Sequence, residues 1–213
     1  MEGRSLSGTI GIVDYGLGNL FSVLGAVEKL GRSGVVTSER EVLSKAEKLI
    51  IPGVGAFGAG INNLHKLGLV DTLTDLVMVQ KKPVLGMCLG AQLMMSTSEE
   101  APGTNGLGWL VGKVEKIQPQ NAEIRTPHVG WNEVHEGNPG TLLRGIPDRT
   151  LFYFVHSYFM NPEEDRAITG YFNYGTRMCA LIEYNHIFAA QFHPEKSQQC
   201  GLQLLENFLD YKF

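Results

Sequence analysis

Apolar residues in the first half of the chain form two alternating kinds of pattern. They recur at helical spacing over residues 20–30 and again over residues 58–80. Short, wholly apolar runs between these stretches predict buried strands at residues 9–14, 34–37, 48–51 and 83–87. Strands and helices that alternate in this order predict an α/β fold, with a mostly parallel central sheet flanked by helices on both faces.

The pattern changes after about residue 106, where strand-like segments follow one another with only turn residues between them. Such segments are expected at residues 112–118, 125–134, 150–159, 167–175, 179–185 and 187–192. Because no long helical insertion separates them, we expect additional antiparallel strands in the C-terminal half. Apolar residues over 202–209 predict a closing amphipathic helix. Neither a repeat nor a low-complexity linker interrupts the chain, which predicts a single domain over residues 1–213, with residues 1–8 as a flexible tail.

Composition narrows the class of protein. At 213 residues, with 43% hydrophobic and 19% charged residues, the chain is typical of one soluble globular domain. The net charge of −4 argues against nucleic acid or an anionic membrane as a partner. The N-terminal residues lack the apolar core of a signal peptide, and no apolar run approaches the roughly 18 residues that span a bilayer. We therefore expect a cytoplasmic protein.

The cysteines are Cys88, Cys179 and Cys200, an odd number without a CxxC pair. This usage argues against a disulfide framework and against a zinc site, and it fits a reducing compartment. We expect neither a bound metal nor an organic cofactor.

Cys88 stands between two glycines, at the point where a predicted strand becomes a helix. The run Gly86-Met87-Cys88-Leu89-Gly90 has the spacing of a nucleophile elbow, with cysteine in place of serine. Such a strained turn leaves no room for side chains two residues away on either side, and it presents the thiol above the sheet edge. The N-terminus of the following helix favours the thiolate, and the Leu89 N–H is placed to stabilise an oxyanion. A buried structural cysteine is the alternative from this pattern alone.

A base for such a nucleophile follows a strand near the other end of the chain. His193-Pro194-Glu195 comes directly after the apolar run 187–192, and extended backbone puts His193 and Glu195 on the same side. His193 can take the cysteine proton and return it to a leaving amine, while Glu195 holds the ring in one tautomer. A single histidine at a strand end is more often structural. Because ligands gather at the carboxyl ends of strands in open α/β sheets, the pair together with Cys88 predicts an active site.

A glycine-rich loop after the third predicted strand has two interpretations. Gly53-x-Gly55-x-x-Gly58 matches a dinucleotide fingerprint, but the match is in the wrong place, because it follows the third strand and no acidic residue ends a second one. We favour a loop whose backbone approaches a small substrate and completes the oxyanion hole. Glycines on both sides of Val54 leave its peptide free to rotate, so we expect that rotation to switch the second oxyanion donor.

These three elements together make the sequence resemble the class I, triad-type glutamine amidotransferases. The matching pieces are "PGVGAFG", "GMCLGAQ" and "QFHPEKS", and no catalytic position departs from the family's pattern. Within the family the chain is similar to the glutaminase subunits of imidazole glycerol phosphate synthases, of histidine biosynthesis. That likeness covers nearly the whole chain and is carried by "DYGLGNLFSV", "SEEAPGTNGLGW", "PHVGWNEV" and "FYFVHSY".

The resemblance implies a role for each matching position. Cys88 corresponds to the nucleophile that forms a γ-glutamyl thioester, His193 to the acid–base, and Glu195 to the orienting carboxylate. The oxyanion donors correspond to Val54, Gly55 and Leu89. The residues expected to bind glutamine are Gly53, Gln92, His156, Ser157 and Tyr158. For His156, a satisfied core histidine is an equally good interpretation.

The resemblance also implies a partner. Family members hydrolyse glutamine and deliver the ammonia to a (β/α)₈-barrel cyclase, which makes imidazole glycerol phosphate and an aminoimidazole carboxamide ribonucleotide. Because the chain ends at Phe213, after the closing helix, we expect the cyclase to be a separate subunit that forms a heterodimer with it. The residues expected at the interface are Asn19, Trp131, Tyr153 and Lys196, although Trp131 could equally lie in the core.

Other functions remain open at this point. The chain could be the glutaminase subunit of another amidotransferase, such as anthranilate synthase, or a stand-alone γ-glutamyl hydrolase that needs no partner. A non-catalytic interaction module on the same fold is a further alternative. It predicts the loss of a triad residue, and none is lost here.

Overall fold

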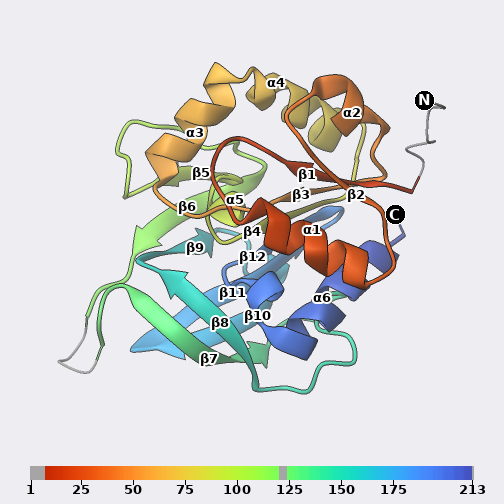
Figure 1. Cartoon of the computed structure of the whole chain (residues 1–213). Coiled ribbons are helices and arrows are strands. Elements are labelled where there is room, and N and C mark those ends of the chain that lie inside the picture. Colours follow the sequence, from red (N-terminus) through yellow and green to blue (C-terminus); the bar gives the residue numbers. More distant parts are fainter. Residues whose placement is uncertain (1–7, 120–123, 213) are drawn as a thin grey trace.

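A large mixed sheet organises the molecule. The computed structural model describes residues 8–119 and 124–212, so the expected flexible tail lies, apart from Gly8, outside the described residues. Within them, a central sheet of nine strands has the order β2-β1-β3-β4-β12-β11-β10-β7-β8, and a second sheet has the order β5-β6-β9. Figure 1 shows helices on two sides of the central sheet, which confirms the predicted α/β fold.

One half of the central sheet is parallel, as predicted. β1 (Ile10–Val13) pairs with β2 (Gly34–Thr37) and β3 (Lys48–Ile51), and β4 (Val84–Met87) joins β3 to β12 (Ile187–Ala190). The four inner strands are buried at every position, whereas the edge strand β2 is half-buried, because helices cover both faces only over the interior of the sheet. This pairing places the carboxyl ends of β4 and β12 side by side.

The other half of the central sheet is antiparallel, which confirms the expectation for the C-terminal half. It continues from β12 through β11 (Thr176–Tyr184), β10 (Ile168–Tyr174), β7 (His128–Glu136) and β8 (Thr150–His156). Side chains alternate between buried and more exposed along β8, so one face of this half packs against the core.

A smaller sheet stands beside the central one. It pairs β6 (Leu110–Lys116) in parallel with β5 (Met95–Ser98) and antiparallel with β9 (Tyr158–Pro162). The segment 150–159, expected as one strand, is therefore two, because the chain leaves the central sheet at Ser157. The sequence pattern missed β5 because the strand is short and polar.

Two apolar cores pack against the central sheet, beneath the helices that Figure 1 shows on its two sides. One core packs beneath α2 (Arg40–Lys45), α3 (Phe57–Lys66), α4 (Leu69–Thr74) and the π-helical turn Asp75–Val79. The other core packs beneath α1 (Leu20–Lys29) and α6 (Gln198–Asp210). Two 3₁₀ turns are at Asp165–Ala167 and Pro194–Lys196. Across residues 8–119 and 124–212, no helix is both long and apolar enough to cross a bilayer.

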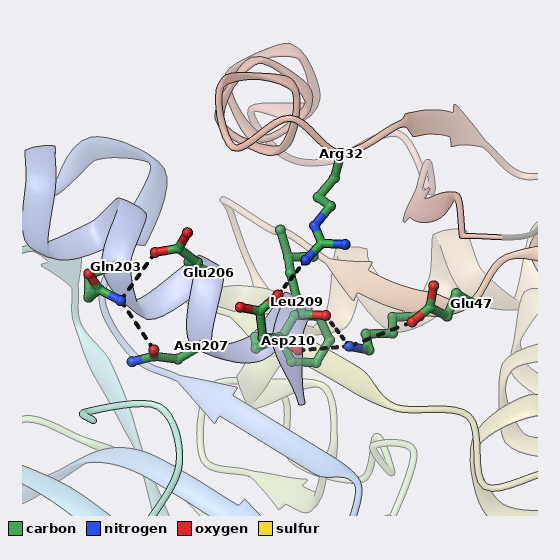
Figure 2. A network of polar contacts seen from close by, with 9 residues as sticks. Arg32, Glu47, Gln203, Glu206, Asn207, Leu209 and Asp210 are labelled. Atoms are coloured by element: carbon green, nitrogen blue, oxygen red, sulfur yellow. Dashed lines mark hydrogen bonds and ion pairs between the residues drawn. The ribbon is translucent and has the colours of Figure 1, made fainter. Parts of the chain in front are cut away.

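The closing helix α6 is tied to the parallel half of the sheet by a buried lysine. Lys48, at the start of β3, donates from Nζ to the carbonyls of Phe208 and Leu209 in the last turn of α6. Burial lowers the pKa of Lys48, and the ammonium group suits the negative end of the helix. Beside it, Arg32 forms an ion pair with Asp210 (Figure 2). These contacts fix the end of α6 against β3.

Candidate active site

Cys88 has the backbone conformation of a nucleophile elbow. It follows the last residue of β4 with φ 52° and ψ −112°, a conformation that a residue with a side chain rarely adopts. A Cβ added to Gly86 would lie 2.7 Å from Ala91 Cα, and one added to Gly90 would lie 1.8 Å from the Ile51 carbonyl oxygen. Both flanking glycines are therefore required by space, as the sequence predicted.

The helix after the nucleophile is a single turn. α5 covers only Leu89–Gln92, and the Gln92 N–H donates to the Cys88 carbonyl at 3.1 Å. A single turn sums few peptide dipoles, so α5 contributes less to thiolate stabilisation than a full helix would. The elbow geometry, rather than a long helix, is thus the feature that the structure adds at Cys88.

His193 lies close to Cys88, and it is oriented by Glu195. The Cys88 N–H donates to the Ala190 carbonyl at 2.8 Å, which joins the elbow to the end of β12, three residues before His193. His193 Nδ1 lies 2.8 Å from Glu195 Oε1, and the two side chains are 3% and 2% exposed. Because a carboxylate only accepts, Nδ1 carries the hydrogen and Nε2 is left for the nucleophile. Burial opposes the imidazolium, yet the hydrogen bond to Glu195 and the interactions with Cys88 and Glu195 raise the pKa of His193 to about 9.

The thiol does not yet bond to its base in this conformation. Cys88 Sγ donates to the Val155 carbonyl at 3.8 Å, and His193 Nε2 is buried without a hydrogen-bond partner among the described residues. The two side chains are nonetheless close enough for the negative charge of an ionised Cys88 to raise the pKa of His193.

The glycine loop passes directly over the elbow. A Cβ on Gly53 would lie 2.2 Å from Tyr15 Oη and 2.7 Å from the Gly90 nitrogen, whereas Gly55 has a positive φ of 109°. Close packing accounts for the first glycine and backbone conformation for the second. The freedom of the Val54 peptide, expected from glycines on both sides, thus depends on Gly55, because Gly53 is held by its neighbours.

A cavity of about 410 Å³ opens over Cys88 and contains most of the predicted site. The predicted residues that line it are Val54, Gly55, Cys88, Leu89, Gln92, His156, Ser157, Tyr158 and Lys196. Gly53 does not line the cavity, because it packs against Tyr15 and Gly90, and His193 is buried and does not line it either. Within the described part of the chain, no cluster of three or more histidine, cysteine or acidic side chains could hold a metal ion.

Three lining residues were not expected from the sequence: Glu100, Pro127 and Val155. Glu100 Oε2 accepts from the Phe57 N–H, the first residue of α3, at 2.7 Å. From the sequence alone, its segment "SEEAPGTNGLGW" indicates only a likeness to a subfamily. The carboxylate of Glu100 lies in the cavity because the segment that follows β5 is placed beside Cys88 by the fold.

Gln92 and His156 are both held by a single backbone carbonyl. Gln92 Nε2 and His156 Nδ1 lie 2.7 Å and 2.8 Å from the Tyr158 carbonyl oxygen. His156 is 6% exposed and also contacts His128, as expected of a core histidine, and it lines the cavity as well, so its role in binding glutamine stays a prediction.

The residues expected at a partner interface lie in two places. Trp131 is 44% exposed, so the alternative that it lies in the core is wrong. Its ring meets that of Tyr153 at 5.9 Å between centroids, and Lys196 Nζ lies 5.7 Å from the Tyr153 ring. Asn19 is exposed at the N-cap of α1, on a different loop.

Sequence comparisons place the chain among enzymes. It is 43% identical over 200 residues to imidazole glycerol phosphate synthase subunit HisH 2 of Pseudomonas aeruginosa, which covers 93% of this chain and 98% of that protein. It is 45% identical over 199 residues to imidazole glycerol phosphate synthase subunit HisH of Moorella thermoacetica, with 93% of each chain covered.

Solved structures share the fold at lower identity. A crystal structure of a glutamine amidotransferase has a TM-score of 0.74 at 20% identity and covers 94% of this chain and 97% of its own. PurLQS from Thermotoga maritima has a TM-score of 0.72 at 16% identity, with 96% and 99% covered. The family model for glutamine amidotransferase class-I matches residues 12–211, nearly the whole chain. With its elbow cysteine and its buried histidine–glutamate pair, this chain belongs to the class I glutamine amidotransferases.

Proposed function

We propose that this protein is the glutaminase subunit of an imidazole glycerol phosphate synthase. It hydrolyses glutamine to glutamate and ammonia and supplies the ammonia to a separate cyclase subunit. The observation that carries the chemistry is the meeting of two strand ends, where the Cys88 elbow on β4 lies against the His193–Glu195 pair after β12. Relatives named as subunits of this synthase, at 43% and 45% identity over nearly the full chain, support the choice of pathway.

The geometry supports a two-step reaction on Cys88. The thiol proton of Cys88 passes to His193 Nε2, which gives a thiolate–imidazolium pair, and the thiolate Sγ attacks the carboxamide carbon of glutamine to form a tetrahedral intermediate. The Leu89 N–H and an N–H of the Val54–Gly55 loop stabilise the oxyanion. As the C–N bond breaks, the imidazolium returns its proton to the amine, which leaves as ammonia. Water, activated by the neutral imidazole, then attacks the thioester and releases glutamate and the thiol.

The cavity suits the charged end of glutamine. Glu100 brings a carboxylate to the wall, which complements an α-ammonium group, and the peptide groups of Ser157 and Tyr158 can bond the α-carboxylate. Gln92 contacts the substrate from the first turn after the nucleophile. These assignments leave His193 free for proton transfer, with Glu195 to orient its ring.

We place the partner on the exposed surface formed by Trp131, Tyr153 and Lys196, with Asn19 as a second contact. Aromatic residues are enriched at protein interfaces, and Lys196 belongs both to this surface and to the cavity wall. A (β/α)₈-barrel docked there would receive ammonia before water protonates it. The cytoplasm suits this reaction, because Cys88 must stay reduced to act as a nucleophile.

Complementation and an ammonia bypass together test the proposal. The gene should rescue a histidine-requiring strain that lacks this glutaminase, and it should not rescue a tryptophan-requiring strain that lacks the anthranilate synthase glutaminase. Cys88→Ala should abolish glutamine-dependent synthesis in the complex and leave synthesis from added ammonium salts intact. Cys200→Ser, outside the site, is the matched control and should keep both activities. Rescue of the tryptophan strain alone, or full glutaminase activity of Cys88→Ala, would overturn the proposal.

A further inference from the structure

The side-chain amide of Gln92 is held in one orientation from the buried side. Gln92 is 5% exposed, and its Nε2 lies 2.7 Å from the Tyr158 carbonyl oxygen and 3.1 Å from Gln191 Oε1. A backbone carbonyl can only accept, so the atom facing Tyr158 must be the amide nitrogen. Both hydrogens of that nitrogen are then used, and the oxygen is the atom left for the cavity that Gln92 lines.

Gln191 is placed to enforce this orientation. It is fully buried just beyond the end of β12, two residues before His193, and its N–H is held by the Ala180 carbonyl at 2.9 Å. Its side-chain nitrogen has no hydrogen-bond partner among the described residues. A buried donor without a partner is unfavourable, so an apolar side chain would serve packing better. What glutamine adds at this position is the acceptor oxygen that meets Gln92.

Two buried histidines hold the Tyr158 carbonyl through a series of hydrogen bonds, and the donors and acceptors of that series can be assigned in only one direction. His156 Nδ1 must donate to that carbonyl at 2.8 Å, so its Nε2 accepts from His128 Nδ1 at 3.1 Å. His128 Nε2 then accepts from Asn132 Nδ2 at 3.4 Å. Asn132 Nδ2 is identified as the nitrogen because it also donates to the Asn173 carbonyl at 3.0 Å. A single set of tautomers satisfies every contact.

This series of hydrogen bonds requires both imidazole rings to be neutral, and their surroundings keep them neutral. Burial lowers the pKa of His128 to about 4 and that of His156 to about 3. His128 stacks on Tyr174 and Phe154, with ring centroids 4.0 Å and 5.0 Å away. The direction of this hydrogen-bond series is therefore unchanged through the neutral pH range.

We propose that Gln191 and the His128–His156 pair are positioning residues, which hold the Gln92 carboxamide with its oxygen toward the cavity, where it accepts from an N–H donor of bound glutamine. This inference rests on the proposed glutaminase function. The donor is either the carboxamide NH₂ or the α-ammonium group. An inward-facing oxygen repels a carboxylate, so in the first case it would also favour glutamine over the product glutamate.

Binding measured by calorimetry tests the inference without turnover. All variants are made in the full-length Cys88→Ala chain in complex with its cyclase. Gln191→Met should weaken glutamine binding by about tenfold, the effect of roughly 1.4 kcal/mol. In a chain that already carries Gln92→Met, the same change should add almost nothing, because Gln191 acts through Gln92. Thr169→Val is the matched control, since Thr169 Oγ1 is also buried without a described partner but lies on β10, outside the site.

Two altered substrates distinguish the donors. L-Glutamate γ-methyl ester lacks the carboxamide N–H, and glutaramate lacks the α-ammonium group. If the carboxamide is the donor, Gln191→Met should spare binding of the ester, and if the α-ammonium is the donor, it should spare binding of glutaramate. Equal tenfold losses for both analogues would overturn the inference.

Further outcomes separate this inference from the function beneath it. Additive losses for Gln191→Met and Gln92→Met, or a loss as large in Thr169→Val, would overturn the positioning role and leave the proposed function standing. Absence of glutamine binding by the Cys88→Ala parent would overturn both. If Gln191→Met does not fold, His128→Phe takes its place, because it keeps the ring stack and removes the hydrogen bonds. His128→Phe should weaken glutamine binding when Gln92 is present and add almost nothing to Gln92→Met. A loss of the same size in both backgrounds would refute the inference.

Discussion

Replacing Glu195 by glutamine should move the alkaline limb of the pH profile to lower pH. His193 Nδ1 donates to Glu195 Oε1 at 2.8 Å, and burial opposes the imidazolium while Cys88 and Glu195 raise the pKa of His193 to about 9. The imidazolium that protonates the leaving amine is thus present below about pH 9 and is lost as the pH rises through that value. Removing one of the groups that raise the pKa moves this loss to lower pH.

The size of the shift follows from the contact that is lost. A glutamine side chain can keep an acceptor oxygen opposite Nδ1, with its nitrogen in the place of Glu195 Oε2, which is buried and unpaired among the described residues. The tautomer is then preserved and only the charge disappears. A hydrogen bond to a charged group contributes about 1.5–3 kcal/mol and one pKa unit is about 1.36 kcal/mol, so we expect a shift of about one to two units.

The assay is kcat/KM for glutamate release by the complex, measured across the alkaline range for wild type and Glu195→Gln. Glu206→Gln, on the exposed side of α6, is the matched control and should leave the limb in place. His193→Asn should be slower than Glu195→Gln at every pH, because a general base contributes about 10²–10⁴-fold. An alkaline limb that does not move in Glu195→Gln would refute the assigned role of this carboxylate.

Three other predictions concern the elbow and the loop. A glutamine-analogue electrophile should label Cys88 alone among the three cysteines, and mass spectrometry that finds the adduct elsewhere would contradict the elbow. Gly90→Ala should lower the free energy of unfolding by about 3 kcal/mol or more in urea denaturation, because the new methyl group meets a backbone carbonyl. Its control, Gly25→Ala on α1, meets no atom within 4 Å and should raise that free energy by about 0.5–1 kcal/mol. The isolated chain should hydrolyse glutamine about 10²–10³-fold more slowly than the complex, as expected if the Val54 N–H is a missing oxyanion donor, and rates within about tenfold would exclude that switch.

The sequence by itself determined the local parts of the site. An elbow needs a strand, a cysteine and glycines two residues away on either side, and all of these lie between Val84 and Gln92. The His193–Glu195 contact is equally local, because the two residues are two apart in the chain. The parallel and antiparallel halves of the sheet could also be predicted from the sequence, because helical insertions between strands allow parallel pairing and their absence favours antiparallel pairing.

Only the tertiary structure decided which side chains meet across the chain. Gln92 contacts Gln191 because β4 pairs with β12, and Glu100 lines the cavity because β5 belongs to the smaller sheet beside the central one. Trp131 is a comparable case, since an apolar-looking strand gives no sign of which face is covered, and the structure leaves this ring exposed. Sequence spacing specifies neighbours within one turn or one strand, whereas contacts between strands depend on register and burial, which the whole fold sets at once.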